Sequence, residues 1–278
     1  MNGSVESFSR PLVVLAASGL LLTACGRAEP DRPRVEVPPP VVAPAAPLPV
    51  PVITTLDRRA LLDALRLAAS NHAAGARSEG PDALVSKRFS VSLAFGCEGP
   101  QPVVEGQAEG LARWSWAPER RAIRLSMTPG DWTRSALVDG TGWEAVEGFW
   151  IARPWLEGPG CPAPITDPLT SDQDPASPQT VGLAAVFETG GSRLERRDGR
   201  AYAVSVRPDG AAEAVTPPPD GYRLRLQGRI GAFPDGRAIR CRSAGPDQRP
   251  VCIAALRLDR VAFEEADGSS LAEWRVGG

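Results

Sequence analysis

Hydrophobic and polar residues alternate along several short stretches from residue 88 onward. In residues 88–95, every second position is apolar, from Phe89 to Phe95, which is the period of a β-strand with one buried face. Further short runs follow at residues 103–104, 112–116, 122–127, 134–138 and 143–146. Gly, Pro and Asp separate these runs, and this arrangement predicts an antiparallel meander.

The last third of the chain carries the clearest alternation. Tyr222, Leu224 and Leu226 alternate with arginine and glutamine, so one face of this strand is apolar. Comparable runs occupy residues 239–242, 253–258, 261–263 and 271–276, and a hairpin is expected around Asp198-Gly199. Residues 181–187 fit either a strand or a helical turn. The predicted fold is mainly β, an antiparallel sheet of meander, sandwich or barrel-like form with one N-terminal helix.

The expected helix covers residues 56–74, where leucine and alanine recur at helical spacing. Thr54 is the predicted N-cap, with Asp57 near the positive end of the helix dipole. His72 falls near the other end, where a histidine more often interacts with the dipole than catalyses a reaction. The helix is expected to pack on the sheet within one domain, residues 54–278. A subdomain break near the proline-rich residues 157–180 is the alternative.

A short apolar run from Pro11 to Cys25 precedes these elements. It ends in Leu22-Thr23-Ala24-Cys25, which resembles the lipobox of bacterial lipoproteins. The resemblance implies a signal peptide at residues 1–24 and a lipid on Cys25. An ordinary transmembrane anchor is disfavoured, because crossing the hydrocarbon core needs about 20 apolar residues. Gly26 stands where the lipoprotein class uses Asp for inner-membrane retention, so the resemblance implies the outer membrane, facing the periplasm or the cell surface.

Residues 25–53 are rich in proline and contain no aromatic residue. Such a segment cannot bury enough apolar surface to fold, and proline favours an extended conformation. It is therefore predicted to be a disordered stalk between the lipid and the domain. The alternative is that it serves as a PxxP ligand for a partner protein.

Four cysteines remain once Cys25 is assigned to lipid, and outside the cytoplasm they are expected to form disulfides. Three pairings are open in principle. We favour Cys241 with Cys252, because these two residues flank a turn-rich segment. Cys97 with Cys161 then follows by elimination. A metal site is disfavoured, since the chain has no CxxC motif and its single histidine, His72, is distant in sequence.

The charge balance excludes one broad class of partner. The formal net charge is -2, and removing residues 1–24 does not change it, because Glu6 and Arg10 leave together. Nucleic acid is not an expected partner, since its binders usually carry a basic excess. No motif in the sequence calls for a cofactor.

Catalytic groups are sparse in this sequence. Ser86 and Lys87 are adjacent in sequence, so in a strand they would point to opposite faces. A two-carboxylate glycan hydrolase requires only two acids at the right separation. Asp139, Glu144 and Glu147 lie closest to the aromatic region and are the residues to test for it. Whether the protein is an enzyme is left open, with binding favoured.

The tryptophans suggest one binding surface. Six of the seven lie between Trp114 and Trp155, and Trp114 and Trp116 are expected to share a strand face. Indole rings can stack on sugars, but core packing is the default role of tryptophan. Trp150 and Trp155 lie near glycine and proline and are expected in loops, which makes them candidates for an exposed site.

Arginines suggest a second surface. Arg223, Arg225, Arg240, Arg242 and Arg257 occupy the polar positions of the last strands. On neighbouring strands they would form a stripe that binds phosphate or carboxylate groups. The alternative is a solvated face on which arginines pair with Glu264, Glu265 and Glu273.

These features together predict a lipid-anchored envelope protein with a binding or structural role. Its expected partners are the membrane, through the lipid, and an envelope glycan or envelope protein. The carboxylate-based hydrolase is the alternative.

Overall fold

The computed structural model describes residues 55–76, 82–101, 109–117, 121–138, 142–162, 179–190, 201–208 and 215–275. These residues belong to one compact unit, Pro51–Gly278. The elements are α1 (Arg58–Ala73), β1 (Arg88–Phe95), β2 (Ala112–Trp116), β3 (Ile123–Met127), β4 (Gly130–Asp131), β5 (Trp143–Trp150), β6 (Val181–Glu188), β7 (Tyr202–Val206), β8 (Tyr222–Ile230), β9 (Ile239–Arg242), β10 (Val251–Glu264) and β11 (Ser270–Arg275). Cys25, the proline-rich segment, residues 103–104 and the hairpin expected at Asp198-Gly199 lie outside the described residues.

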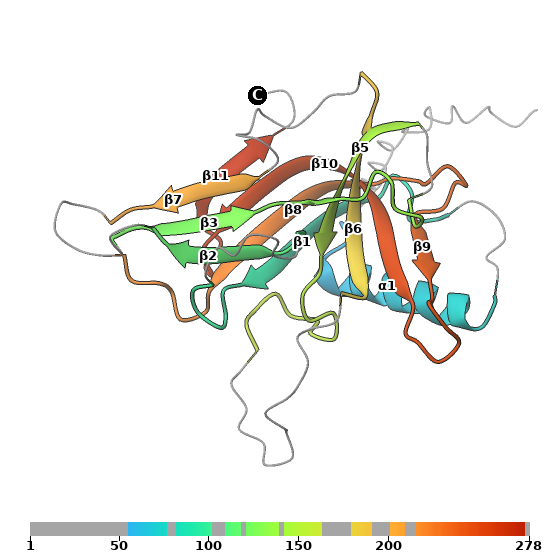
Figure 1. The fold of residues 1–278 in the computed structure, drawn as a ribbon, viewed down its shortest axis with the longest axis horizontal. Coiled ribbons are helices and arrows are strands. Elements are labelled where there is room, and N and C mark those ends of the chain that lie inside the picture. The colour runs from blue at the N-terminus through green and yellow to red at the C-terminus, as the bar shows by residue number, and fades with distance from the viewer. Residues whose placement is uncertain are drawn as a thin grey trace, which may run out of the picture. The chain divides into compact units, whose positions relative to one another are not determined.

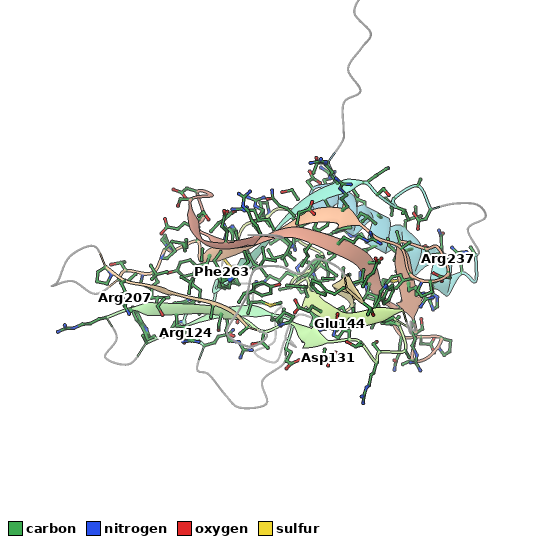
Figure 2. All side chains as sticks on the ribbon, turned by 90° about the horizontal axis from the view of Figure 1, so that it is seen from above. Arg124, Asp131, Glu144, Arg207, Arg237 and Phe263 are labelled. Carbon is green, nitrogen blue, oxygen red and sulfur yellow. A yellow bond between two sulfur atoms is a disulfide. The ribbon has the colours of Figure 1, made fainter. Side chains whose placement is uncertain are left out.

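The strands form two sheets, which confirms a mainly β fold with one helix (Figure 1). The larger sheet has the order β1-β8-β10-β6-β5-β4, with β9 and β11 also paired to β10, and the smaller has the order β2-β3-β7. Neither sheet closes into a barrel within the described residues. Figure 2 shows Arg124 of β3 and Phe263 of β10 in different layers, with side chains between them.

One hydrophobic core joins the two sheets. Leu125 and Tyr202 of the smaller sheet are buried in the same cluster as Leu224 and Phe263 of the larger sheet. The apolar positions of β1 and β8 face this core, because Val91 is directly opposite Leu226 in the antiparallel register. The alternation in the sequence therefore identified the buried face of both strands.

The strand order departs from a simple meander at β10. This strand pairs antiparallel with β8, β9 and β11 but parallel with β6. Residues 181–187, which fitted two interpretations, lie in β6. Since parallel neighbours cannot be joined by a tight turn, no local pattern in the sequence announces this pairing.

The runs at residues 253–258 and 261–263 belong to the single strand β10. Its register against β8 shifts between Leu258 and Arg260, so the two runs are separated by a bulge and not by a turn. Gly228 lies opposite the bulge, where a Cβ atom would come within 2.0 Å of the Arg257 carbonyl oxygen. Only glycine fits at this close approach.

The helix begins later than expected. Its N-cap is Asp57, whose carboxylate accepts a hydrogen bond from the Ala60 N–H at 2.8 Å, so the prediction of Thr54 as the cap was wrong. Leu61, Leu62 and Leu65 are buried in the core. His72 is exposed in the last turn. No helix among the described residues is long and apolar enough to cross a membrane.

Candidate functional site

A buried arginine fixes the segment that follows β5. Arg58, the first residue of α1, is only 6% exposed. Its Nε atom donates to the Leu156 carbonyl oxygen at 3.0 Å, and Nη2 donates to the carbonyl oxygens of Ala152 and Arg153 at 3.0 and 3.1 Å. Burial, with the nearby charges of Arg153 and Arg66, lowers the Arg58 pKa to about 10. The guanidinium thus holds three carbonyl groups of one loop in a fixed arrangement.

Further contacts hold the same loop, residues 151–162, against the domain. A disulfide joins Cys161 to Cys97. Arg153 forms an ion pair with Glu98 at 2.8 Å, and Arg66 of α1 forms one with Glu157 at 3.2 Å. We call this segment the clamped loop.

The disulfides also identify the compartment. Besides Cys97–Cys161, the structure contains Cys241–Cys252, which links directly opposite residues of β9 and β10. Both bonds have the pairing expected from the sequence. Two disulfides in one domain indicate an oxidising, extracytoplasmic location.

Trp155 extends from the clamped loop into solvent. Its side chain is 56% exposed, and among the described residues it and Leu67 are the large apolar side chains most open to water. A loop that is already held loses little backbone entropy on binding, and tryptophan is enriched among binding hot spots. Of the two tryptophans expected in loops, Trp150 and Trp155, only Trp155 lies as expected.

Trp150 does not lie in a loop, and that prediction was wrong. It is the last residue of β5, half-buried, with its ring 4.6 Å from that of Trp132. Trp132 covers Gly148, where a Cβ atom would come within 2.0 Å of the indole. Gly148 therefore leaves the space that the Trp132 ring occupies against the strand, and it does not mark a turn. Trp114 and Trp116 share a strand face as expected, with ring centroids 5.5 Å apart; Trp114 is buried in the core, and Trp116 is partly buried against it.

The five arginines proposed as a stripe are not brought together. Arg223 and Arg225 pair with the last residues of β10, whereas Arg240 and Arg242 on β9 pair with its first residues. Arg240 donates to the Val138 carbonyl oxygen at 2.7 Å. It also forms an ion pair with Asp235 at 3.1 Å and lies over the face of the Phe233 ring, 5.0 Å from the ring centroid.

The remaining members of the predicted stripe also differ from one another. Arg223 is buried and donates to the Asp220 carbonyl oxygen at 2.8 Å, and its burial lowers its pKa. Arg242 is exposed at the end of β9, and Arg257 is exposed and paired with Glu188. A single arginine-lined groove across these strands is therefore ruled out.

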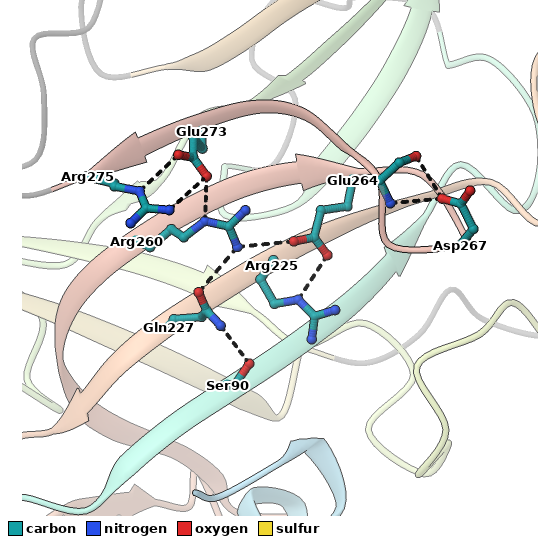
Figure 3. Close-up of polar contacts among 9 residues, drawn as sticks. Ser90, Arg225, Gln227, Arg260, Glu264, Asp267, Glu273 and Arg275 are labelled. Carbon is teal, nitrogen blue, oxygen red and sulfur yellow. Dashed lines mark hydrogen bonds and ion pairs between the residues drawn. The ribbon is translucent and has the colours of Figure 1, made fainter.

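Arginines and glutamates form a network on the outer face of the larger sheet (Figure 3). Glu264, only 4% exposed, accepts from Arg225 at 2.9 Å and from Arg260 at 3.1 Å. Glu273 of β11 accepts from Arg260 at 2.8 Å and from Arg275 at 2.9 Å. We call these five residues the paired network. The alternative to a binding stripe, pairing of its arginines with Glu264, Glu265 and Glu273, holds for Arg225 with Glu264, whereas Glu273 pairs with Arg260 and Arg275 from outside the predicted stripe.

The carboxylates proposed for hydrolysis occupy unlike environments. Glu147 is buried and accepts a hydrogen bond from the Tyr202 hydroxyl at 3.2 Å. Glu144 is exposed, and Asp139 lies outside the described residues. Within the part of the chain that the structure describes, no group of three or more His, Cys, Asp or Glu side chains is placed to hold a metal ion.

Comparison with known proteins gives no relative: no family model, curated protein or solved structure matches this chain. Sequence reasoning had also missed Arg58. A charged residue in the first turn of an amphipathic helix ordinarily faces water, and nothing in its neighbourhood in the sequence indicates three carbonyl partners from a loop more than ninety positions away.

Proposed function

We propose that this protein is a lipid-anchored binding protein of the bacterial cell envelope. In this proposal Cys25 carries the lipid, the proline-rich segment is a stalk, and Gly26 directs the anchor to the outer membrane, facing the periplasm or the cell surface. The resemblance of residues 22–25 to a lipobox supports the anchor. The extracytoplasmic location indicated by the two disulfides is consistent with it.

The exposure of Trp155 on the clamped loop is the observation that carries the binding role. Its indole presents an apolar face with a polar N–H, and such a face stacks on the apolar side of a sugar ring. Envelope glycan is therefore the proposed ligand class. The clamped loop is held by Arg58 and by the Cys97–Cys161 disulfide, so that little ordering of its backbone is needed when a ligand arrives.

Labelling with palmitate tests the anchor. The wild-type protein should incorporate the label, and Cys25→Ser should lose both the label and signal-peptide removal. Unchanged labelling of Cys25→Ser would refute the anchor.

Trp155→Ala tests the binding role. With purified envelope glycan fragments as the probe, we expect affinity to fall by about 2 kcal/mol, the size of a hot-spot loss, while the unfolding midpoint stays near that of the wild type. Trp155→Phe should recover part of the affinity. Trp114→Ala is the matched control, and it should instead lose about 3 to 5 kcal/mol of stability because Trp114 is buried. Wild-type affinity in Trp155→Ala would refute the binding role.

A further inference from the structure

Three arginines lie side by side on the outer face of the larger sheet, beyond the paired network. Arg229 of β8 is directly opposite Arg88 of β1 on one side and Arg257 of β10 on the other. Directly opposite residues on neighbouring strands point to the same face, with Cβ atoms about 5 Å apart. All three side chains are exposed. We call Arg88, Arg229 and Arg257 the arginine row.

Little negative charge balances this row. Arg257 pairs with Glu188, whose side chain is itself half exposed. Among the residues that the structure describes, Arg88 and Arg229 have no ion pair, and neither has Asp259, the exposed acid at the bulge in β10. Like charges directly opposite one another destabilise a sheet. A bound anion would neutralise these positive charges and so relieve the repulsion between the arginines.

The chain enters the domain beside the row. The Leu56 N–H donates to the Arg88 carbonyl oxygen at 2.8 Å, and the Ser90 N–H donates to the Leu56 carbonyl oxygen at 2.9 Å. Leu56 thus lies against the first residues of β1. Any tether attached ahead of Thr55 therefore reaches the domain at the edge that carries Arg88.

We propose that the arginine row docks on phosphate groups of anionic lipid headgroups. Guanidinium groups match phosphate oxygens with paired hydrogen bonds. Three of them across three strands span about 10 Å, so that separate headgroups can be contacted at once. The choice of a membrane as the source of phosphate rests on the proposed lipid anchor, which keeps the row within reach of a bilayer surface.

Vesicle binding of the full-length lipoprotein tests this docking surface. The probes are phosphatidylcholine vesicles with and without phosphatidylglycerol. Because the acyl chains insert into both kinds, the readout is the ratio of affinity for anionic vesicles to affinity for neutral ones. We expect this ratio to exceed one, to fall about fivefold for each arginine removed, and to approach one at high salt.

Arg229→Gln and Arg88→Gln are the test variants, and either one suffices if the other fails to fold. Arg124→Gln is the matched control, since it removes the same charge from an exposed position on the smaller sheet (Figure 2). The ratio should stay at the wild-type value in the control.

Several outcomes would overturn the proposal. They are an unchanged ratio in both test variants, an equal fall in Arg124→Gln, or saturable binding of inorganic phosphate without preference for anionic vesicles. Failure of palmitate labelling would instead refute the anchor. The vesicle experiment and the palmitate labelling thus distinguish failure of the docking surface from failure of the lipid anchor.

Discussion

The paired network and the arginine row lie on the same outer face of the larger sheet, yet their charges are balanced differently. In the paired network, Glu264 and Glu273 stand between Arg225, Arg260 and Arg275. In the arginine row, three arginines are in direct register, and the one ion pair that they form within the described residues, Arg257 with Glu188, is exposed. Arginine thus stabilises the sheet in the paired network, whereas in the arginine row it leaves positive charge available for a ligand.

Removing the central acid of the paired network should have the largest effect. Glu264→Gln leaves Arg225 and Arg260 without their shared carboxylate, and we expect a loss of about 2 to 3 kcal/mol in the free energy of unfolding. The expected loss is smaller than the loss on breaking a fully buried ion pair, because both arginines keep some contact with water. Urea denaturation measures it. Glu188→Gln, which removes the acid paired with Arg257 of the arginine row, is the control and should change stability by no more than about 0.5 kcal/mol. Equal losses in the two variants would remove the contrast.

Reversing one charge in the arginine row should stabilise the domain. Arg229→Glu places an acid between Arg88 and Arg257, and two favourable cross-strand pairs should add about 0.5 to 1 kcal/mol. The same variant should lose the preference for anionic vesicles. Salt should shrink the gain in stability, since it screens exposed charges. A loss of stability in Arg229→Glu would contradict the view that the row is repulsive in the free protein.

Acid should weaken the outer edge of the paired network by a small amount. Hydrogen bonds from Arg275 and Arg260 lower the Glu273 pKa below its ordinary value of 4.5. A lowered pKa in the folded state means that Glu273 contributes stability at neutral pH, and that this contribution is lost as the pH falls through the folded-state value. The stability difference between the wild type and Glu273→Gln should therefore shrink in acid. Urea denaturation of both proteins at neutral pH and in acid measures this difference. A difference that does not depend on pH would contradict the pairing of Glu273 with Arg260 and Arg275.

Period-two alternation was enough to predict much of the sheet. It distinguished the core-facing Tyr222, Leu224 and Leu226 from Arg223 and Arg225 on the opposite face, because a strand has only two faces. Which strands are neighbours depends on packing between residues far apart in the sequence. The register that sets Arg88 beside Arg229 was therefore not available from local patterns, and neither was the parallel pairing of β6 with β10.

The candidate site was predictable in part. Trp155 is exposed beside Pro154, where proline and glycine ordinarily mark a turn. The same reasoning failed at Trp150, because Gly148 belongs to a strand and accommodates the Trp132 ring. A glycine near a tryptophan in the sequence can therefore mark a loop, or it can mark a place where an aromatic ring packs closely on a strand.

The central place of β10 has a consequence for the time at which the domain can fold. Residues 251–264 pair with β6, β8, β9 and β11, so the larger sheet lacks its middle until this late segment has been synthesised. Without β10, the pair of β1 and β8 is not joined to β6, β5 and β4, and pairing over such long separations is slow. Completion of the larger sheet and closure of the Cys241–Cys252 disulfide thus depend on the same strand, β10.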